Sequence, residues 1–399
     1  MLFLCHLAGC EKRELIEPTP GMDVGERYQV RVLLFDNIRE CSLESESGFS
    51  VIDSTSEARA DFTNHSGAVL VRIQEGKIIV GEHVFGKTVE IRPSSPFVLN
   101  VNGALYRGNL NLTADAEEAS FDAINVVPLE AYLAGVVGAE MPSYWEPEAL
   151  KAQAVASRTY CLNIKNRYGA GRNWDVRKTQ AHQVYKGVAA ETRTIWDAVN
   201  ETTGKVLICN NDRGVESIFP AYYSSTCGGY TEYSKNVFGD SYESLVPVEC
   251  PYCKNVAKMS YYFWPMVEFD TKAVSNRLIS HYPKLASLQK IVNVEPSKLS
   301  KYGKVARIVS VKLVGKNGKS ESLRGEDFRL TIDPTGNKIK SMACQMSNKK
   351  GKFVFYGGRG FGHGVGMCQC GAQGMARKGK TCEEILAYYY PGSHIVRVF

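Results

Sequence analysis

The 399-residue sequence has no stretch of eighteen apolar residues and no dense tract of Lys and Arg. The first absence argues against a transmembrane helix, and the second makes nucleic acid a poor candidate partner. The sequence also contains no internal repeat and no low-complexity segment. Apolar residues make up 44% and charged residues 23% of the chain, as in a globular protein with an ample core. The net charge of +6 suits an anionic polymer or membrane surface without requiring one.

The N-terminus contains Leu7-Ala8-Gly9-Cys10, which resembles a bacterial lipobox, in which the cysteine becomes the lipidated first residue. A polar, proline-bearing stretch follows, so we predict a lipoprotein signal and tether over residues 1–21. The apolar region before Cys10 is short and lacks a positive segment. A start codon placed too late explains both features, and an accidental apolar terminus is the alternative. We expect an exported envelope lipoprotein that faces the periplasm or wall and meets the membrane only through its lipid.

The remaining pattern predicts the α+β fold class. Alternating apolar and polar residues, separated by turn-forming residues, indicate a β-rich N-terminal region over 22–122. Its expected strands are 28–35, 67–73, 77–84, 87–91 and 97–101. Helices and strands then mix over 123–399, which we expect to form an α/β catalytic domain with a divergent segment at about 254–304.

Several helix signals are local. The clearest helix runs from 146 to 168, with Pro147 in its first turn and Gly169 at its C-cap. Thr381 and Glu384 form a capping box for a helix near the C-terminus. Two segments carry weaker signals: residues 254–300 are interpreted as helical and polar, and residues 328–332 as a strand.

Glu140 precedes the long helix and is the first candidate for chemistry. Lys151 and Arg158 are seven residues apart, so they share a helical face, about 20° out of register. A carboxyl group that donates a proton needs a raised pKa, which apolar neighbours such as Met141 and Trp145 favour. The two cations would lower that pKa, so its direction stays open. Alternatively, Glu140 caps the helix and both cations are solvated.

Two loops could present groups to a sugar. Tyr222, Tyr223 and Ser224 end a strand before the tight turn Gly228-Gly229. The alternatives are a plain β-turn, or a Cys227 nucleophile with His182 or His363 as its base. The other loop has six glycines between residues 357 and 366, with His363 in its middle. It fits neither a phosphate loop nor a dinucleotide fingerprint, and such dense glycine indicates close approach to other backbone or to a flat ligand.

The cysteines suggest a metal site. Twelve cysteines are many for a reducing cytosol, and Cys250-Pro-Tyr-Cys253 has the spacing of half a zinc site. Cys227 lies upstream, and His182 is the nearest histidine in sequence for the fourth position. A structural zinc is therefore one interpretation, beside a disulfide or free thiols.

Four ordered motifs resemble the stage II sporulation protein D family and its amidase-enhancer relatives. The first is the pair of segments 127–142 and 148–160, and the others are 183–187, 223–231, and 362–369 through 388–392. The resemblance covers about 124–248 and 305–399. It implies a peptidoglycan lytic transglycosylase acting on denuded glycan strands, which are strands stripped of stem peptides.

The resemblance also implies roles for residues. Glu140 matches the family's catalytic glutamate, the general acid/base that leaves 1,6-anhydro-muramyl ends, and no cofactor is required for this chemistry. Substrate binding is implied for Lys151, Arg158, Tyr222, Tyr223, Ser224, Gly228, Gly229, His363 and Gln369. Some family members bind zinc near the motif that follows His182. The enhancer relatives imply an alternative function, a non-catalytic glycan-binding protein that recruits or stimulates a cell-wall amidase.

Overall fold

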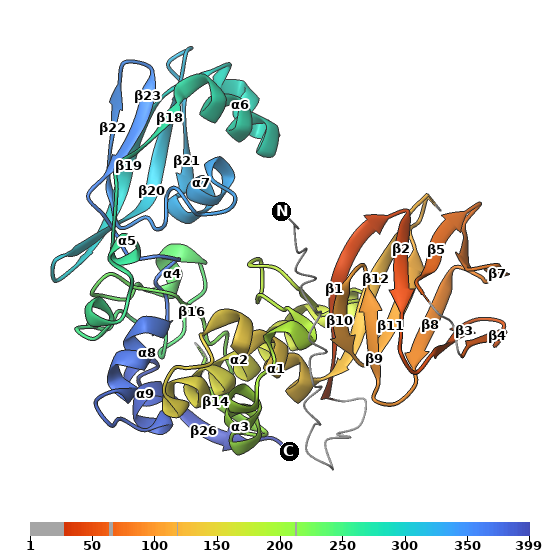
Figure 1. The fold of residues 1–399 in the computed structure, drawn as a ribbon. Helices are drawn as coiled ribbons and strands as arrows, with labels where there is room; N and C mark the ends of the chain where they lie inside the picture. Colours follow the sequence, from red (N-terminus) through yellow and green to blue (C-terminus); the bar gives the residue numbers. More distant parts are fainter. Residues whose placement is uncertain (1–27, 64–66, 118, 212–213) are drawn as a thin grey trace, which may run out of the picture. The chain divides into compact units, whose positions relative to one another are not determined.

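The computed structural model describes residues 28–63, 67–117, 119–211 and 214–399, and its fold is α+β, as the sequence predicts. The tether over 1–21 and Cys10 lie outside these residues. The chain divides into two compact units, one of residues 1–139 with 177–200 and one of residues 140–176 with 201–399 (Figure 1). The expected domain boundary at 122/123 lies inside a strand of the first unit. No helix in the described part of the chain has the length and apolar character needed to cross a membrane.

The first unit is built on two antiparallel sheets, drawn in red and orange in Figure 1. One sheet has the order β1 (Gln29–Ile38), β12 (Phe121–Pro128), β11 (Asn109–Ala114), β8 (Thr88–Pro93), β3 (Phe49–Asp53), β4 (Arg59–Phe62), with the short β13 (Val176–Arg177) at its edge. The other has the order β10 (Ala104–Arg107), β9 (Val98–Val101), β2 (Glu40–Glu44), β5 (Val69–Gln74), β6 (Lys77–Val80), β7 (His83–Val84). Four of the five strands expected from the alternating pattern are present, whereas the segment 77–84 forms a hairpin in which β6 pairs antiparallel with β7.

The segment after β12 continues as α1 (Leu129–Glu140), whose close packing depends on glycine. A Cβ atom on Gly138 would lie 2.0 Å from the Ala190 carbonyl oxygen, and one on Gly135 would lie 2.5 Å from the Tyr185 ring. The elements nearby are η3 (Gly187–Ala190) and α3 (Arg193–Glu201). Because the glycines remove those clashes, the Gly-spaced pattern of α1 encodes its contact with this segment.

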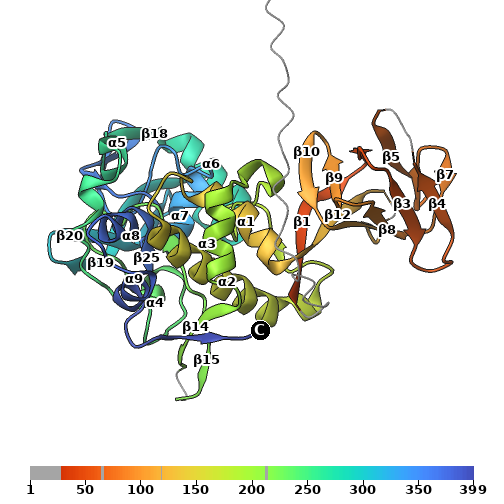
Figure 2. The same cartoon turned by 60° about the horizontal axis from the view of Figure 1, so that its bottom comes forward.

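The second unit centres on α2 (Pro147–Tyr168), the helix that the sequence predicts most clearly. Its alanine-rich stripe is fully buried and packs against α8 (Gln369–Ala376) and α9 (Cys382–Tyr389), as Figure 2 shows. Small side chains allow this close approach, and the predicted capping box of Thr381 and Glu384 starts α9. A small sheet of order β15 (Glu216–Ile218), β14 (Lys205–Asn210), β26 (His394–Arg397) accompanies these helices.

Short elements connect these helices to the rest of the unit. They are η2 (Gly169–Gly171), β16 (Tyr223–Ser224), α4 (Ser234–Val237), η4 (Cys253–Asn255), α5 (Met259–Tyr262), β17 (Phe263–Trp264), β24 (Gly358–Arg359) and β25 (Met367–Cys368). Two of them, β16 and β25, pair in parallel and join segments that are far apart in sequence.

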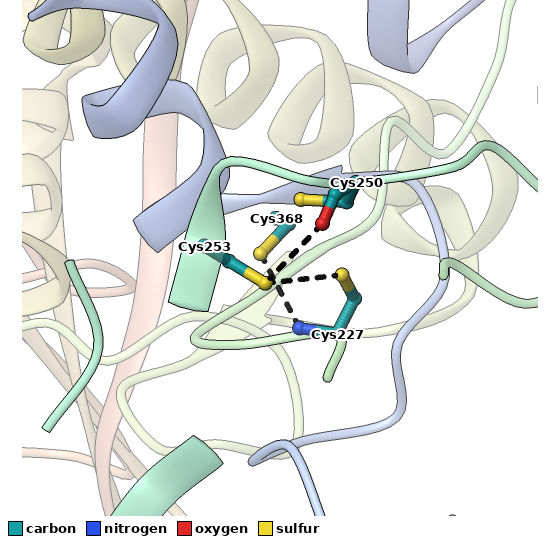
Figure 3. Close-up of side chains that lie close together, drawn as sticks. All are labelled: Cys227, Cys250, Cys253 and Cys368. Atoms are coloured by element: carbon teal, nitrogen blue, oxygen red, sulfur yellow. Dashed lines mark hydrogen bonds between the residues drawn. The ribbon is translucent and has the colours of Figure 1, made fainter. Parts of the chain in front are cut away.

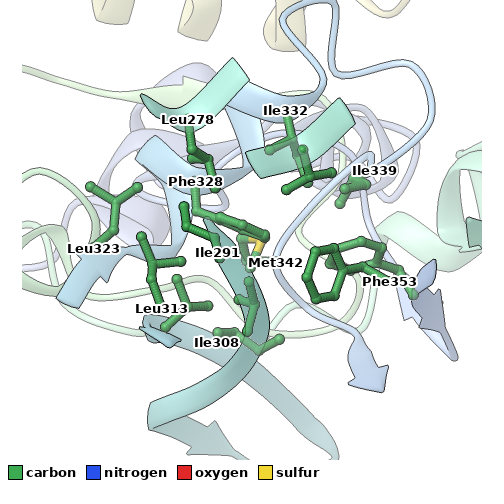
Figure 4. Packing of buried hydrophobic residues seen from close by; sticks show 14 of the residues in the cluster. Leu278, Ile291, Ile308, Leu313, Leu323, Phe328, Ile332, Ile339, Met342 and Phe353 are labelled. Atoms are coloured by element: carbon green, nitrogen blue, oxygen red, sulfur yellow. The ribbon is translucent and has the colours of Figure 1, made fainter. Parts of the chain in front are cut away.

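A separate hydrophobic core lies in the segment that includes the divergent region (Figure 4). It is formed between α6 (Thr271–His281), α7 (Gly325–Ile332), η5 (Pro283–Leu288) and two three-stranded sheets. The sheets have the orders β18 (Val267–Asp270), β23 (Lys352–Tyr356), β22 (Gln345–Lys349) and β19 (Ile291–Tyr302), β20 (Val305–Gly315), β21 (Ser320–Arg324).

Two predictions for this segment are wrong. Residues 254–300 are not helical throughout, because β19 crosses their end and pairs with β20. Its polar residues lie on an exposed face, which the sequence does not distinguish from a polar helix. Residues 328–332 are the end of helix α7 and not a strand. Phe328 and Ile332 are four residues apart, so they share one helical face and fill the core together.

Candidate functional site

Glu140 is the last residue of α1 and is partly exposed. Gln369, the first residue of α8, donates a hydrogen bond from Nε2 to Glu140 Oε2 over 3.3 Å. The same amide lies 3.4 Å from Gln153 Oε1, and Gln153 Nε2 donates to Ser157 Oγ over 2.9 Å. Both glutamines are buried. The result is a chain of amides that runs from α2 through α8 to one oxygen of Glu140.

This amide chain orients the carboxyl group of Glu140. A buried amide that would lose two acceptors by moving has little freedom, so Gln369 fixes where Glu140 Oε2 lies. The expected role of Gln369 was substrate binding, whereas its nearest functional partner in the structure is Glu140. The sequence did not single out Gln153 or Ser157 as site residues. Their helical spacing of four was visible, but nothing in it connected them to Gln369.

Lys151 is compensated by two carboxylates. Its Nζ lies 2.8 Å from Glu148 Oε1 and 2.5 Å from Glu201 Oε2. The hydrogen bonds to Glu148 and then Glu201 raise the pKa of Lys151, so it stays charged. Glu148 also accepts the Cys382 N–H, 2.7 Å away, at the start of α9. Lys151 therefore helps to hold α2 against its neighbours.

Arg158, which was expected to bind substrate, is fully buried. Its Nη1 donates to the Lys205 carbonyl oxygen over 3.0 Å, at the start of β14. The next residue, Thr159, accepts the Leu207 N–H at 2.9 Å. The seven-residue spacing places Lys151 and Arg158 on one face of α2, as predicted. At Arg158, however, that helical face packs on β14. The guanidinium is therefore enclosed by protein atoms in this structure.

The tyrosine-rich strand end is only partly accessible. The Tyr222 hydroxyl donates to Asp240 Oδ2 over 2.9 Å, and its ring stacks on Phe238 with centroids 4.0 Å apart. Burial raises the pKa of both Tyr222 and Asp240. Tyr223 is half-buried and Ser224 is buried. Of these three side chains, Tyr222 and Tyr223 are the ones that retain exposed surface for a ligand.

Two glycines of the glycine-rich loop lie directly on other backbone, which is one of the two close approaches that the sequence left open; Gly358 and Gly364 instead face the Trp264 ring and the Arg307 guanidinium. A Cβ on Gly366 would lie 2.0 Å from the Tyr222 carbonyl oxygen, and one on Gly360 would lie 2.5 Å from the Thr226 carbonyl oxygen. Gly228 faces the backbone of Arg359 in the same way. The loop thus lies directly on the strand end that precedes Gly228-Gly229.

His363 is held as a neutral ring inside this loop. Its Nδ1 accepts the Val365 N–H over 3.0 Å, and its ring packs edge-on against Phe238 and Tyr222. Burial lowers the pKa of His363 to about 4, against a weaker opposing effect of Glu326. An uncharged imidazole that hydrogen-bonds to the loop backbone stabilises the loop's conformation.

Four cysteine sulfurs meet beside the same loops (Figure 3). They belong to Cys227, Cys250, Cys253 and Cys368, all buried, and their Sγ atoms lie within 4.8 Å of one another. The predicted fourth member, His182, is not among them. It belongs to the other compact unit, where its Nδ1 accepts the Arg177 N–H at 3.1 Å.

The cluster bears on two of the earlier interpretations. Burial raises the pKa of Cys227 far above its ordinary value, which disfavours the thiolate that a nucleophile requires. Around His182, the described residues form no group of three or more His, Cys, Asp or Glu ligands. The zinc site that the family resemblance implied near that histidine is therefore not formed by the described residues.

Comparison with known proteins identifies the protein family. The family model described as Stage II sporulation protein matches residues 117–209, which include α1, α2 and Glu140. The chain is 34% identical over 284 residues to Stage II sporulation protein D of Bacillus subtilis (strain 168), covering 67% of this chain and 74% of that protein. The protein of the same name from Bacillus amyloliquefaciens is 30% identical over the same shares. The chain therefore belongs to the stage II sporulation protein D family.

A further relative is the Amidase enhancer of Bacillus subtilis (strain 168). It is 28% identical over 398 residues, which cover 86% of this chain and 53% of that protein. The similarity to it extends over more of this chain than the similarity to the sporulation proteins.

Proposed function

We propose that the protein is a peptidoglycan lytic transglycosylase that cleaves denuded glycan strands with Glu140 as general acid and base. Family membership supports a role related to the cell wall. The observation that carries the catalytic part is the hydrogen bond from buried Gln369 to Glu140, a residue that lies within the region matched by the family model. A carboxyl group oriented by a buried amide is pre-organised for proton transfer.

The proposed reaction needs one carboxyl group. Protonated Glu140 donates its proton to the glycosidic oxygen as the bond from C1 to that oxygen breaks. The resulting carboxylate then takes the proton of the muramyl 6-hydroxyl, whose oxygen bonds to C1 and closes the 1,6-anhydro ring. No water is added, and Glu140 ends in its original protonation state. Hydrolysis with two carboxylates is the usual alternative in glycan cleavage.

Two properties of the site suit this chemistry. Glu140 is the last residue of α1 and keeps part of its surface exposed, so a glycosidic oxygen can reach it. Tyr222 and Tyr223 offer partly exposed aromatic surface from the strand end that the glycine-rich loop covers. We assign sugar binding to this surface and positioning of the acid to Gln369, Gln153 and Ser157.

The experiment is product analysis on denuded glycan strands. Mass spectrometry of the wild-type digest is expected to detect 1,6-anhydro-muramyl ends. Glu140→Gln is expected to lower their rate of formation by about 10²-fold or more, the usual contribution of a general acid. Glu146→Gln, an exposed carboxyl six residues away, is the matched control and keeps wild-type activity. Absence of anhydro products, or an active Glu140→Gln variant, rejects the enzyme.

The second candidate function is stimulation of a cell-wall amidase without catalysis. It is favoured by the extent of the match to the Amidase enhancer, 86% of this chain. It predicts that the protein binds glycan strands and increases the rate of a purified amidase. The Glu140→Gln variant should increase that rate as much as the wild type does. Under either function the protein acts in the envelope, and we propose Cys10 as its lipid-anchored residue. Metabolic labelling with a palmitate analogue tests this anchor. The label should be incorporated into the wild type and lost in Cys10→Ala.

A further inference from the structure

We infer that Cys227, Cys250, Cys253 and Cys368 together bind one zinc ion, in a site whose fourth ligand is Cys368. Their sulfurs come from three separate segments, namely the loop after β16, the segment that leads into η4 together with the first residue of η4, and strand β25. The four side chains are 0–1% exposed. The inference does not depend on whether Glu140 cleaves glycan.

The spacing of the sulfurs fits a single tetrahedral metal. Zinc–sulfur bonds of about 2.3 Å at tetrahedral angles place ligand sulfurs about 3.8 Å apart. The Sγ atoms of Cys227 and Cys253 are 3.7 Å apart, and all four lie within 4.8 Å of one another. A disulfide would instead join two of them at about 2.05 Å, and all four cysteines are unpaired.

Hydrogen-bonding groups around the sulfurs are those expected of thiolate ligands. The Cys227 N–H points to Cys368 Sγ at 3.3 Å, and the Tyr389 hydroxyl lies 3.1 Å from Cys250 Sγ. Outer contacts of this kind orient metal ligands and stabilise their charge. Gly371 completes the enclosure, because a Cβ there would lie 2.6 Å from Cys250 Sγ.

A metal at this position would fasten the loops that form the candidate site. Strand β25 pairs in parallel with β16, Ser224 opposite Cys368, and Cys250 donates its N–H to the Gly229 carbonyl oxygen at 2.9 Å. These segments contain little regular structure, and isolated backbone contacts such as the bridge between Thr226 and Phe361 join them. Gln369 directly follows Cys368, which means that the ion would also set the position of the amide that orients Glu140.

Zinc is favoured over other occupants by the ligand set. Four buried thiolates around one centre suit zinc or a single iron, whereas calcium and magnesium require oxygen ligands. An iron–sulfur cluster also uses four cysteines, but it places several metal atoms between them and spreads the sulfurs further apart. Zinc has no redox chemistry, and bound thiolates are protected from oxidation in the envelope.

The test measures metal content and thiol accessibility in the full-length chain. Purified protein, reconstituted with zinc under reducing conditions and desalted, is analysed by inductively coupled plasma mass spectrometry. We expect one zinc per chain in the wild type and in His182→Ala. Cys368→Ser is expected to lose the ion, whereas Cys370→Ser keeps it, because Cys370 is also buried but lies outside the cluster.

A second measurement uses only wild-type protein, so it stands even if a variant fails to fold. Native protein is treated with an alkylating reagent with and without a strong chelator, and modified peptides are mapped. Chelation is expected to expose the four cluster cysteines together and to lower the melting temperature. Four results would each overturn the inference. The first two are less than one metal ion per chain, and zinc that is lost in His182→Ala but kept in Cys368→Ser. The other two are iron in place of zinc, and a mass 2 Da below that of the reduced chain, which indicates a disulfide.

Discussion

The Nε2 atom of Gln369 lies 3.3 Å from Oε2 of Glu140, although the two residues are 229 positions apart in the chain. Gln369 is buried and also faces Gln153, so its amide cannot turn toward solvent without leaving both partners. A neutral donor at this place is compatible with both protonation states of a carboxyl group. This contact makes Gln369 a positioning residue in the proposed mechanism.

Substitution of Gln369 by Glu is expected to shift the pH dependence of the proposed activity. The change keeps the shape of the side chain and places a second carboxyl beside Glu140. Two carboxyls this close cannot both ionise easily, so the apparent pKa values of the pair separate. Because Glu140 must be protonated to act as the acid, the alkaline limb of the pH profile of kcat/KM should move to higher pH.

Gln373→Glu is the matched control for this prediction. Gln373 is one turn further along α8, is equally buried, and accepts the Glu146 N–H at 2.9 Å. Its substitution is expected to leave the pH profile in place. A Gln369→Glu profile that overlays the wild type would contradict the positioning role, even if that variant were less stable.

Arg158 is predicted to matter for stability rather than for binding. Its guanidinium is fully buried, and Arg158→Leu leaves the Lys205 carbonyl oxygen without its donor. A buried carbonyl oxygen that loses its hydrogen-bond donor costs about 1–3 kcal/mol, which urea unfolding should detect. The affinity of the folded fraction for glycan strands should stay unchanged. Arg167→Leu, at a side chain 41% exposed, is the control and should cost less than about 1 kcal/mol.

His363 is expected to make the protein less stable in mild acid. Its pKa is lowered from 6.5 to about 4 in the folded protein, mainly by burial. Between these two values the unfolded chain takes up a proton and the folded chain does not, so stability is complete above pH 6.5 and is lost as pH falls toward 4. The groups that face the ring electrostatically are Glu326, Arg329 and Arg307.

The size of this effect can be isolated by substitution. Two and a half pKa units correspond to at most about 3 kcal/mol, and partial exposure of the ring reduces this to about 2 kcal/mol. The free energy of unfolding is measured in urea at pH 7 and pH 4.5. Its decrease between these two pH values should be about 2 kcal/mol larger in the wild type than in His363→Gln. His281→Gln, at an exposed ring, should behave as the wild type. Equal pH dependence in all three proteins would contradict the prediction.

What the sequence predicts well depends on signals carried by neighbouring residues. The helix from Pro147 and the capping box at Thr381 were correct because each needs only a few adjacent positions. Helix α7 and strand β19 were missed because their type is decided by the core against which they pack. Short apolar or polar stretches fit either element until a partner is present.

The site shows the same division. Glu140 and three of the four clustered cysteines were selected from motifs and spacing. Cys368 was not, because its spacing from Cys370 does not resemble a zinc motif, and only the parallel pairing of β16 with β25 brings it to Cys227. The burial of Arg158 was likewise hidden, since helical periodicity fixes which residues share a face but not which element covers that face.

Gly371→Ala is predicted to disturb the cysteine cluster through Tyr389. The added Cβ would lie 1.9 Å from the Tyr389 hydroxyl oxygen and 2.6 Å from Cys250 Sγ, so the tyrosine must move. Overpacking of this kind costs about 2 kcal/mol, measurable by urea unfolding. Gly171→Ala, with no atom within 4 Å of its Cβ, should change stability by less than about 0.5 kcal/mol.

The double variant Gly371→Ala/Tyr389→Phe identifies the cause. It removes the hydroxyl oxygen that the new methyl group meets first, so it should be more stable than the sum of the two single changes predicts. Tyr389→Phe alone loses the contact with Cys250 Sγ at 3.1 Å and should be mildly destabilised. If the losses in unfolding free energy of the two single variants are strictly additive, the methyl group strains the helix itself. Glycine would then not be required at this position by the limited space beside Cys250.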